Sequence, residues 1–167
     1  MALILLFRLL KISLTSQQQN NTQSRFTNTM IMQKITVGTT VNASIEKVWD
    51  IWTSPKHIIK WNSPSNDWHT PFAENDLKVG GKFKFTMAAK DGSMSFDFEG
   101  IYTIVENHEK IEYKLADDRE VTIQFDDLGD RVKITESFDP ETVNPLEMQK
   151  SGWQAIIDNF KKYTENI

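Results

Sequence analysis

The hydrophobic residues of this chain first follow a strand pattern and then a helical one. Over residues 34–42 hydrophobic and polar side chains alternate, which predicts a strand with one buried face. Ser44 can cap a helix that extends through Trp52, because hydrophobic residues follow Ser44 at helical spacing. Ser54-Pro55 then begins a second, shorter helix. The polar residues 62–66 after that helix predict a loop.

Beyond Gly80-Gly81 the period of the hydrophobic pattern changes to two. Five short alternating runs follow, at residues 83–87, 96–104, 111–115, 121–125 and 132–138. Turn signals such as Asp91-Gly92 separate the runs, so they predict an antiparallel meander in which each strand has one apolar face. Gly100 lies inside the second run and predicts a bulge or a bend that curls the sheet.

A long helix is predicted after the strands. Asn144 is a suitable N-cap, Pro145 suits the first helical position, and Glu147 can complete a capping box. Hydrophobic side chains then share one helix face with Gln149: Leu146, Trp153, Ile156, Ile157 and Phe160. A helix with such a face must pack on the sheet. The order of elements therefore predicts an α+β helix-grip fold, in which a curved antiparallel sheet and the last helix enclose a pocket.

Length and composition favour one domain, or one domain with a tail. A chain of 167 residues can bury a core without disulfides or a structural metal. The sequence contains no cysteine, which excludes disulfides, thiolate nucleophiles, zinc fingers and iron–sulfur clusters. A reducing compartment is compatible with this composition, and we expect a cytoplasmic location.

The first 31 residues differ in charge from the rest of the chain. They contain three basic and no acidic side chains, which leaves residues 32–167 with 16 basic and 23 acidic residues and a net charge of -7. An acidic domain of this kind lacks the concentrated positive charge that nucleic acids require, so we expect no nucleic-acid partner.

The apolar run at residues 1–14 has several interpretations. It is too short for a transmembrane span, and Arg8 and Lys11 interrupt it as they would not in a signal peptide. An organelle transit peptide remains open, as does a non-native or upstream-translated leader with the start at Met30 or Met32. We expect residues 1–31 to be a disordered extension and residues 32–167 to form the domain.

Motifs of catalytic and cofactor sites do not occur in the sequence. It contains no His-Glu-x-x-His, Gly-x-Ser-x-Gly, Walker loop or dinucleotide fingerprint. The acidic residues at 126–130 lack the spacing and the final glutamate of a calcium loop. We therefore expect no cofactor and no metal ion.

Several short motifs resemble a known family when they are taken in this order and spacing. They are Val48-Trp49, Thr53-Ser54-Pro55-Lys56-His57, Trp61, Asp76-Leu77-Lys78-Val79-Gly80-Gly81, Phe98-Glu99-Gly100-Ile101-Tyr102, Ile111-Glu112-Tyr113, Glu136-Ser137-Phe138 and Gly152-Trp153. With them, residues 32–167 resemble the activator of heat-shock-protein-90 ATPase homologue family (AHSA-like). That family belongs to the START-like, or SRPBCC, superfamily that also contains the birch pollen allergen.

The resemblance implies a fold and a cavity rather than one activity. Members of the superfamily bind lipids, hormones or other apolar ligands, and some catalyse cyclisation or dehydration of polyketides. The family takes its name from a eukaryotic co-chaperone in which this domain is one of two. A chaperone partner therefore stays open for this chain. A homodimer stays open independently of the resemblance.

The candidate ligand-binding residues are large side chains predicted on inner faces, together with two polar ones. They are Trp49, Trp52, Trp61, Trp68, Phe83, Phe85, Met87, Phe96, Phe98, Tyr102, Tyr113, Phe125, Glu136, Gln149, Trp153, Ile156, Ile157 and Phe160. Glu136 alternates with hydrophobic residues and is predicted to point inward, where a carboxylate is costly unless it is paired or protonated. Gln149 is its predicted partner. A β-bulge that turns Glu136 outward, or a locally hydrated strand end, is the alternative.

These residues favour non-catalytic binding of a small, largely apolar ligand. Hydrophobic burial would supply the affinity and one or two polar groups the selectivity. One alternative is a cofactor-free enzyme that uses Glu136 or His69 as acid or base. The other is an interaction module of the chaperone-associated type.

Overall fold

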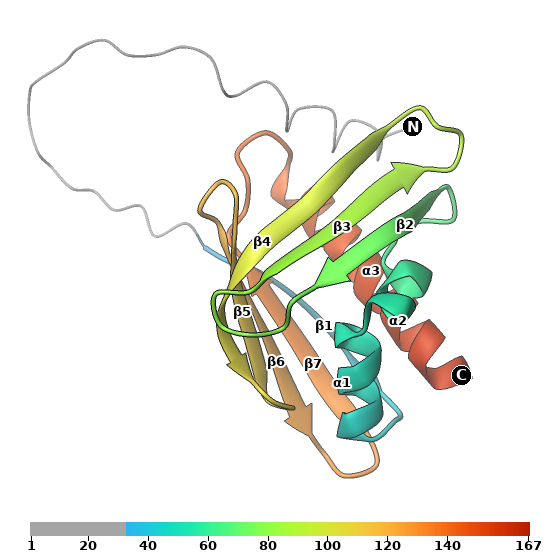
Figure 1. The fold of residues 1–167 in the computed structure, drawn as a ribbon, viewed down its shortest axis with the longest axis vertical. Coiled ribbons are helices and arrows are strands. Elements are labelled where there is room, and N and C mark those ends of the chain that lie inside the picture. The colour runs from blue at the N-terminus through green and yellow to red at the C-terminus, as the bar shows by residue number, and fades with distance from the viewer. Residues whose placement is uncertain (1–32) are drawn as a thin grey trace, which may run out of the picture.

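A computed structural model describes residues 33–167 of the chain as one α+β domain (Figure 1). The elements, in chain order, are β1 (Ile35–Val41), α1 (Ile45–Thr53), α2 (Pro55–Trp61), β2 (Trp68–Asn75), β3 (Lys82–Ala89), β4 (Ser95–Glu106), β5 (Lys110–Leu115), β6 (Glu120–Asp127), β7 (Val132–Phe138) and α3 (Leu146–Asn166). The predictions about disorder, a leader and the start of translation concern residues 1–31, which lie outside the described residues.

The seven strands form one antiparallel sheet in the order β1-β7-β6-β5-β4-β3-β2. The first two strands of the chain are thus its two edges, and α1 and α2 connect them. The 21-residue helix α3 packs against β1 and against both shorter helices, and Figure 1 shows it running behind β2, β3 and β4. This arrangement confirms the predicted helix-grip fold.

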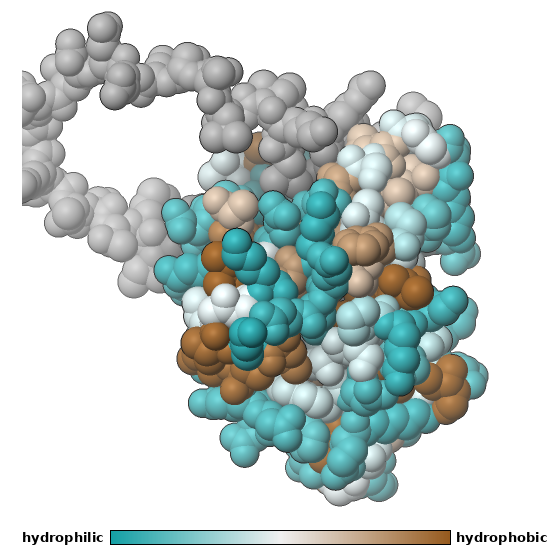
Figure 2. Space-filling model, in the orientation of Figure 1, coloured by the Kyte–Doolittle hydropathy of each residue, from teal (hydrophilic) through white to brown (hydrophobic). Residues whose placement is uncertain are grey.

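The core lies between the sheet and the helices. Its fully buried side chains come from both layers, with Phe138 and Ile134 from β7, Val48 from α1 and Phe160 from α3. At the turn before β4, Gly92 has a φ of 73°, a conformation that favours glycine. The face seen in Figure 2 is mainly hydrophilic, with hydrophobic side chains in separate small groups.

The pattern of hydrophobic residues missed β2. Only Trp68 and Thr70 are buried in this edge strand, so it shows little of the expected alternation. Pro71 also breaks the strand pattern, and it lies where the pairing of β2 with β3 shifts register between His69 and Phe72. Proline is tolerated at such a position because an edge strand need not use every backbone donor.

The predicted start of α3 was wrong by one residue. Pro145 is the N-cap, and no side-chain capping bond forms. Asn144 instead donates from its backbone and side-chain nitrogens to Glu141 Oε1, at 2.9 and 2.7 Å. Leu146, predicted on the buried face, is 55% exposed, since it lies in the first turn where the helix enters from the loop.

Gly100 serves close packing rather than a bulge. A Cβ at this position would lie 2.6 Å from the Lys114 carbonyl oxygen and 2.8 Å from the Phe83 ring. The register irregularity of β4 against β5 falls further on, between Tyr102 and Ile104. The missing side chain therefore leaves space for the Phe83 ring against β4.

Candidate functional site

A cavity of about 120 Å³ lies between the sheet and the helices. Nineteen residues line it: Trp52, Thr53, Trp61, Asn62, Pro64, Asn75, Phe83, Phe85, Met87, Phe96, Phe98, Tyr102, Ile111, Tyr113, Ile123, Glu136, Gly152, Trp153 and Ile156. Nine of them carry aromatic rings, and one is an acid. Half-buried residues occur in the lining on both sides, Phe85, Phe96 and Phe98 on β3 and β4 and Trp52, Trp153 and Ile156 on the helices.

Alternation along the strands directs the rings of the sheet to this cavity. Side chains two residues apart point to the same face of a strand, so Phe83, Phe85 and Met87 of β3 all line the cavity. The Phe83 ring contacts the rings of neighbouring side chains, with centroids 5.0 Å from Phe85 and 4.8 Å from Tyr113. These contacts form a continuous aromatic floor across β3, β4 and β5.

The helices supply three tryptophans to the opposite side. Trp61 donates from Nε1 to the Ile51 carbonyl at 3.1 Å, which fixes the orientation of its ring at the end of α2. Trp52 of α1 lies against it, with centroids 5.2 Å apart. Trp153 of α3 stacks on Phe138 with centroids 3.9 Å apart and planes at 15°. These contacts fix the orientations of the three tryptophan rings that line the cavity.

Glu136 is the one ionic side chain of the lining. It is 6% exposed, and its partners in the sheet are Val37 on β1 and Ile123 on β6. Within residues 33–167, no hydrogen bond or ion pair reaches its carboxyl group. Burial raises the pKa of Glu136 to about 8, because the charged form loses its hydration and gains no partner. The carboxyl group is thus largely protonated at neutral pH.

Two tyrosines add hydroxyl groups to the cavity wall. Tyr102 donates to Asn75 Oδ1 at 2.7 Å, and Asn75 Nδ2 donates to the Thr53 carbonyl at 2.6 Å, which ties β4 and β2 to the end of α1. Burial raises the pKa of Tyr102 above its usual range. Burial, and next the negative charge of Glu136, raise the pKa of Tyr113 well above its ordinary value. Both phenols therefore stay neutral.

Asn62 contributes an unpaired donor. It lines the cavity just after α2 and is 8% exposed. Its amide nitrogen, Nδ2, is buried without a hydrogen-bond partner in the described residues. A buried donor without an acceptor costs free energy, and a polar ligand atom or a water molecule would relieve that cost.

Twelve of the eighteen predicted ligand-binding residues line the cavity: Trp52, Trp61, Phe83, Phe85, Met87, Phe96, Phe98, Tyr102, Tyr113, Glu136, Trp153 and Ile156. Six do not: Trp49, Trp68, Phe125, Gln149, Ile157 and Phe160. Phe125 and Phe160 lie behind Trp52, with ring centroids 5.5 and 4.7 Å from it. His69 is exposed on β2 and is not part of the lining.

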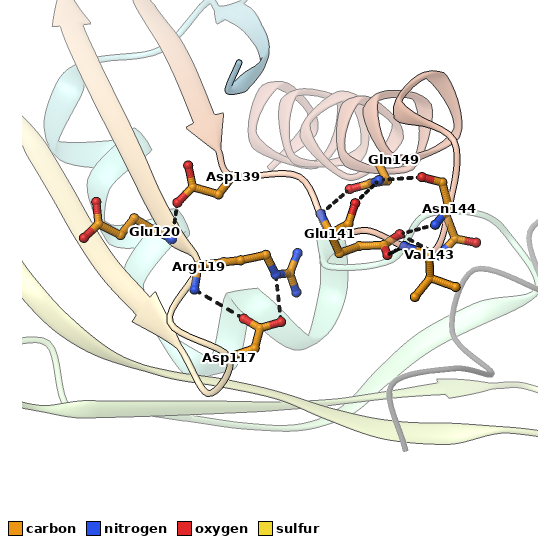
Figure 3. A network of polar contacts seen from close by, with 8 residues as sticks. All are labelled: Asp117, Arg119, Glu120, Asp139, Glu141, Val143, Asn144 and Gln149. Carbon is orange, nitrogen blue, oxygen red and sulfur yellow. Dashed lines mark hydrogen bonds and ion pairs between the residues drawn. The ribbon is translucent and has the colours of Figure 1, made fainter. Parts of the chain in front are cut away.

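Gln149 does not pair with Glu136 as the sequence predicted. Figure 3 shows it facing the loop after β7, where it bonds Glu141 and Asn144. Its Oε1 accepts from the Glu141 backbone nitrogen at 2.9 Å, and its Nε2 donates to the carbonyls of Glu141 and Asn144 at 3.1 and 2.8 Å. The buried face of α3 was predicted correctly for Gln149, but its side-chain amide bonds the backbone of the loop and not Glu136 on the sheet.

Seven lining residues were not among the candidates: Thr53, Asn62, Pro64, Asn75, Ile111, Ile123 and Gly152. Ile111 lies two residues before Tyr113 on β5, and Ile123 on β6 is the pairing partner of Ile111. Both point to the same inner face as Tyr113, so the alternation of hydrophobic residues was sufficient to predict them. Asn62, Pro64 and Asn75 lie in or beside connections whose path the periodicity does not predict.

Two further features of residues 33–167 bear on the kind of site. No group of three or more histidine or acidic side chains is arranged to hold a metal ion in this part of the chain. No helix among these residues is long and apolar enough to cross a membrane.

Comparison with known proteins identifies the family. The family model "Activator of Hsp90 ATPase homolog 1-like protein" matches residues 42–165, and the chain belongs to that family. The predicted resemblance is therefore confirmed. A comparison with curated protein sequences finds no match.

Solved structures of bacterial proteins share the fold. An AHSA1-like protein from Aeromonas hydrophila is 44% identical, with a TM-score of 0.75, over 79% of this chain and 92% of that one. Chr148 from Cytophaga hutchinsonii is 59% identical, with a TM-score of 0.70, over 80% of this chain and 92% of that one. A protein from Chromobacterium violaceum is 23% identical, with a TM-score of 0.72, over 80% of this chain and 99% of that one. At this identity the similarity shows only that the fold is shared.

Proposed function

We propose that this protein binds a small, largely apolar molecule in the cavity between the sheet and α3, and does not change it chemically. The observation that carries the proposal is the combination of nine aromatic rings and one unpaired carboxyl group around one hollow space. Small-molecule sites are commonly concave and apolar with a few polar groups, and these residues have that composition.

Hydrophobic burial would provide most of the affinity. Removing apolar surface from water contributes about 25 cal/mol per Å², and the rings offer apolar contact on both the sheet and the helix side. Orientation would come from the carboxyl group of Glu136 and from Asn62 Nδ2, which lack hydrogen-bond partners in the described residues. A ligand atom that bonds either group would remove part of the cost of burying it.

Catalysis is the alternative that a particular observation favours. A carboxyl group with a pKa of about 8 can exchange a proton near neutral pH, which general acid–base catalysis requires. His69 offers no help, since it is exposed outside the lining. An acid–base mechanism would therefore depend on Glu136 alone.

Native mass spectrometry of the full-length protein tests the proposal. In mass spectra recorded with and without a single-ring hydrocarbon such as toluene, we expect an adduct whose amount saturates as the ligand concentration rises. If the compound released from the protein is chemically unchanged, the protein is a binder; a changed compound would indicate an enzyme. The variant Ile156→Trp, which adds volume to the cavity wall, should lose the adduct. Leu146→Trp, at an exposed position of the same helix, is the matched control and should keep it. Equal binding by both variants would refute the cavity as the site.

A further inference from the structure

We propose that the ligand of this cavity is a small amine, whose ammonium group pairs with Glu136 while its ring or short hydrocarbon part packs among the aromatic side chains. This inference rests on the proposed function above and names the ligand class. It is carried by the position of a solitary acid in an aromatic cavity.

The lining holds one acidic side chain and no basic side chain that could pair with it. Glu136 is an acid, and no lysine, arginine, histidine or aspartate is among the nineteen lining residues. Its carboxyl group also receives no hydrogen bond within the described part of the chain. A buried carboxylate is normally paired or bound to a cation, because burial alone is costly. A ligand ammonium is the partner that would complete the site.

The aromatic rings around the carboxyl group also suit a cation. A positive charge within about 6 Å of a ring face is attracted by the negative face of the ring, most strongly by tryptophan. Trp153 and Tyr113 bound the cavity together with Glu136, and Trp52 and Trp61 bound it from α1 and α2. An ammonium bound in this cavity would thus lie among aromatic rings, and a neutral ligand would lack that electrostatic attraction.

The volume of the cavity limits the ligand to about one ring. An apolar cavity of roughly 150 Å³ takes up benzene, and this cavity measures about 120 Å³. Benzylamine, benzyl alcohol and toluene each carry one ring with a short substituent and differ chiefly in the group that would face Glu136.

Titration of Glu136 gives the amine a pH dependence that the neutral compounds lack. In the sheet Glu136 lies beside Val37 on β1 and Ile123 on β6, and its charge acts on the phenol of Tyr113 on β5. The phenol of Tyr102 on β4 and, from α3, Trp153 and Ile156 line the same cavity. Both phenols stay neutral in the range of interest. Glu136 must lose its proton to pair with an ammonium, so amine affinity should rise about tenfold per pH unit up to the pKa of about 8.

The experiment is an NMR titration of the full chain with the three compounds at pH 6 and pH 8, read at the methyl groups of Ile111, Ile123 and Ile156. At pH 8 we expect benzylamine to bind about tenfold or more tightly than benzyl alcohol. Glu136→Gln should remove this preference, whereas Glu99→Gln, on the exposed face of β4, should retain it. Toluene reports separately whether the cavity of each variant still accepts a ring.

Each outcome decides between the two proposals. Toluene binding without a preference for the amine overturns the amine inference and leaves the proposed function standing. Benzyl alcohol binding as tightly as benzylamine identifies a neutral hydrogen-bonding ligand and also overturns it. An amine preference that persists in Glu136→Gln overturns the role of the carboxyl group. Failure of all three compounds to bind refutes the proposed function at this ligand size, and the inference with it.

Discussion

Trp153 and Phe138 lie face to face, with ring centroids 3.9 Å apart and planes at 15°. Phe138 is fully buried at the end of β7, whereas Trp153 is half-buried on α3 and also lines the cavity. A second contact joins Trp153 to Phe98 of β4, edge to face at 6.0 Å. This one ring therefore holds the helix on the sheet and bounds the space in which a ligand would lie.

Trp153→Ala should destabilise the domain by about 3 kcal/mol, because it removes the stack and enlarges the cavity. Urea unfolding followed by circular dichroism measures this change. Trp153→Phe keeps one ring against Phe138 and should cost less than half as much. Leu146→Ala, on the exposed side of the same helix, serves as the control. An equal loss in the Ala and Phe variants would show that the stack contributes little.

Glu136 should make the stability of the wild-type protein fall as the pH rises. In the folded state the Glu136 carboxyl group keeps its proton up to a pKa of about 8, whereas in the unfolded state it loses the proton near pH 4.5. The folded state therefore binds more protons between these two pH values. The free energy of unfolding then decreases by about 1.4 kcal/mol per pH unit from this group, and levels off above its folded pKa.

Glu136→Gln lacks this ionisation and isolates its effect. The difference in unfolding free energy between variant and wild type should grow by about 3 kcal/mol from pH 5 to pH 8, in favour of the variant. Glu136→Leu should stabilise further and weaken ligand binding, because it removes both the charge and the polar group. A difference that stays constant with pH would mean that the carboxyl group ionises normally in the folded protein.

Gln149 should contribute stability through the loop after β7 and not through the cavity. Gln149→Met has a similar volume but cannot bond the backbone of Glu141 and Asn144, so we expect a loss of about 2 kcal/mol. Hydrogen exchange should show weaker protection at Glu141, whose backbone nitrogen donates to Gln149 at 2.9 Å. Binding of toluene should be unchanged. Loss of binding in this variant would place Gln149 in the site after all.

Gly100→Ala should destabilise the sheet by about 1–3 kcal/mol. The added Cβ would approach the Lys114 carbonyl oxygen to 2.6 Å and the Phe83 ring to 2.8 Å, so backbone and ring must both shift. Thermal unfolding measures the loss, and Thr103→Ala, exposed on the same strand, is the control and should change stability little. An unchanged midpoint in Gly100→Ala would show that β4 and β5 separate easily.

The sequence predicted the parts of this fold in which one face alternates clearly. The runs through Phe83, Tyr113 and Glu136 carry a period of two because one face of each strand meets the core, and the structure places all three in the cavity wall. Strand β2 was not predicted, because an edge strand buries few side chains and tolerates Pro71 at its register shift. Burial on one face, rather than strand propensity, made the other strands visible.

The partners of polar groups were harder to predict than their direction. Glu136 and Gln149 both point inward, but Gln149 lies at the N-terminal part of α3, within reach of the Glu141 backbone. Whether the Gln149 amide bonds the Glu136 carboxyl group or the Glu141 backbone depends on the path of the loop after β7. The periodicity of hydrophobic residues carries no information about that path. The same reason explains why Asn62 and Pro64 were not recognised in the lining.

The most direct test of the account is a methyl NMR titration of the wild-type protein with toluene. The isoleucines provide both reporter and control, because Ile111, Ile123 and Ile156 line the cavity, whereas Ile51 and Ile134 are buried elsewhere in the core. We predict saturable shifts for the first three and little change for the other two. Shifts that do not saturate, or that are equally large at Ile51 and Ile134, would contradict a ligand site between the sheet and α3.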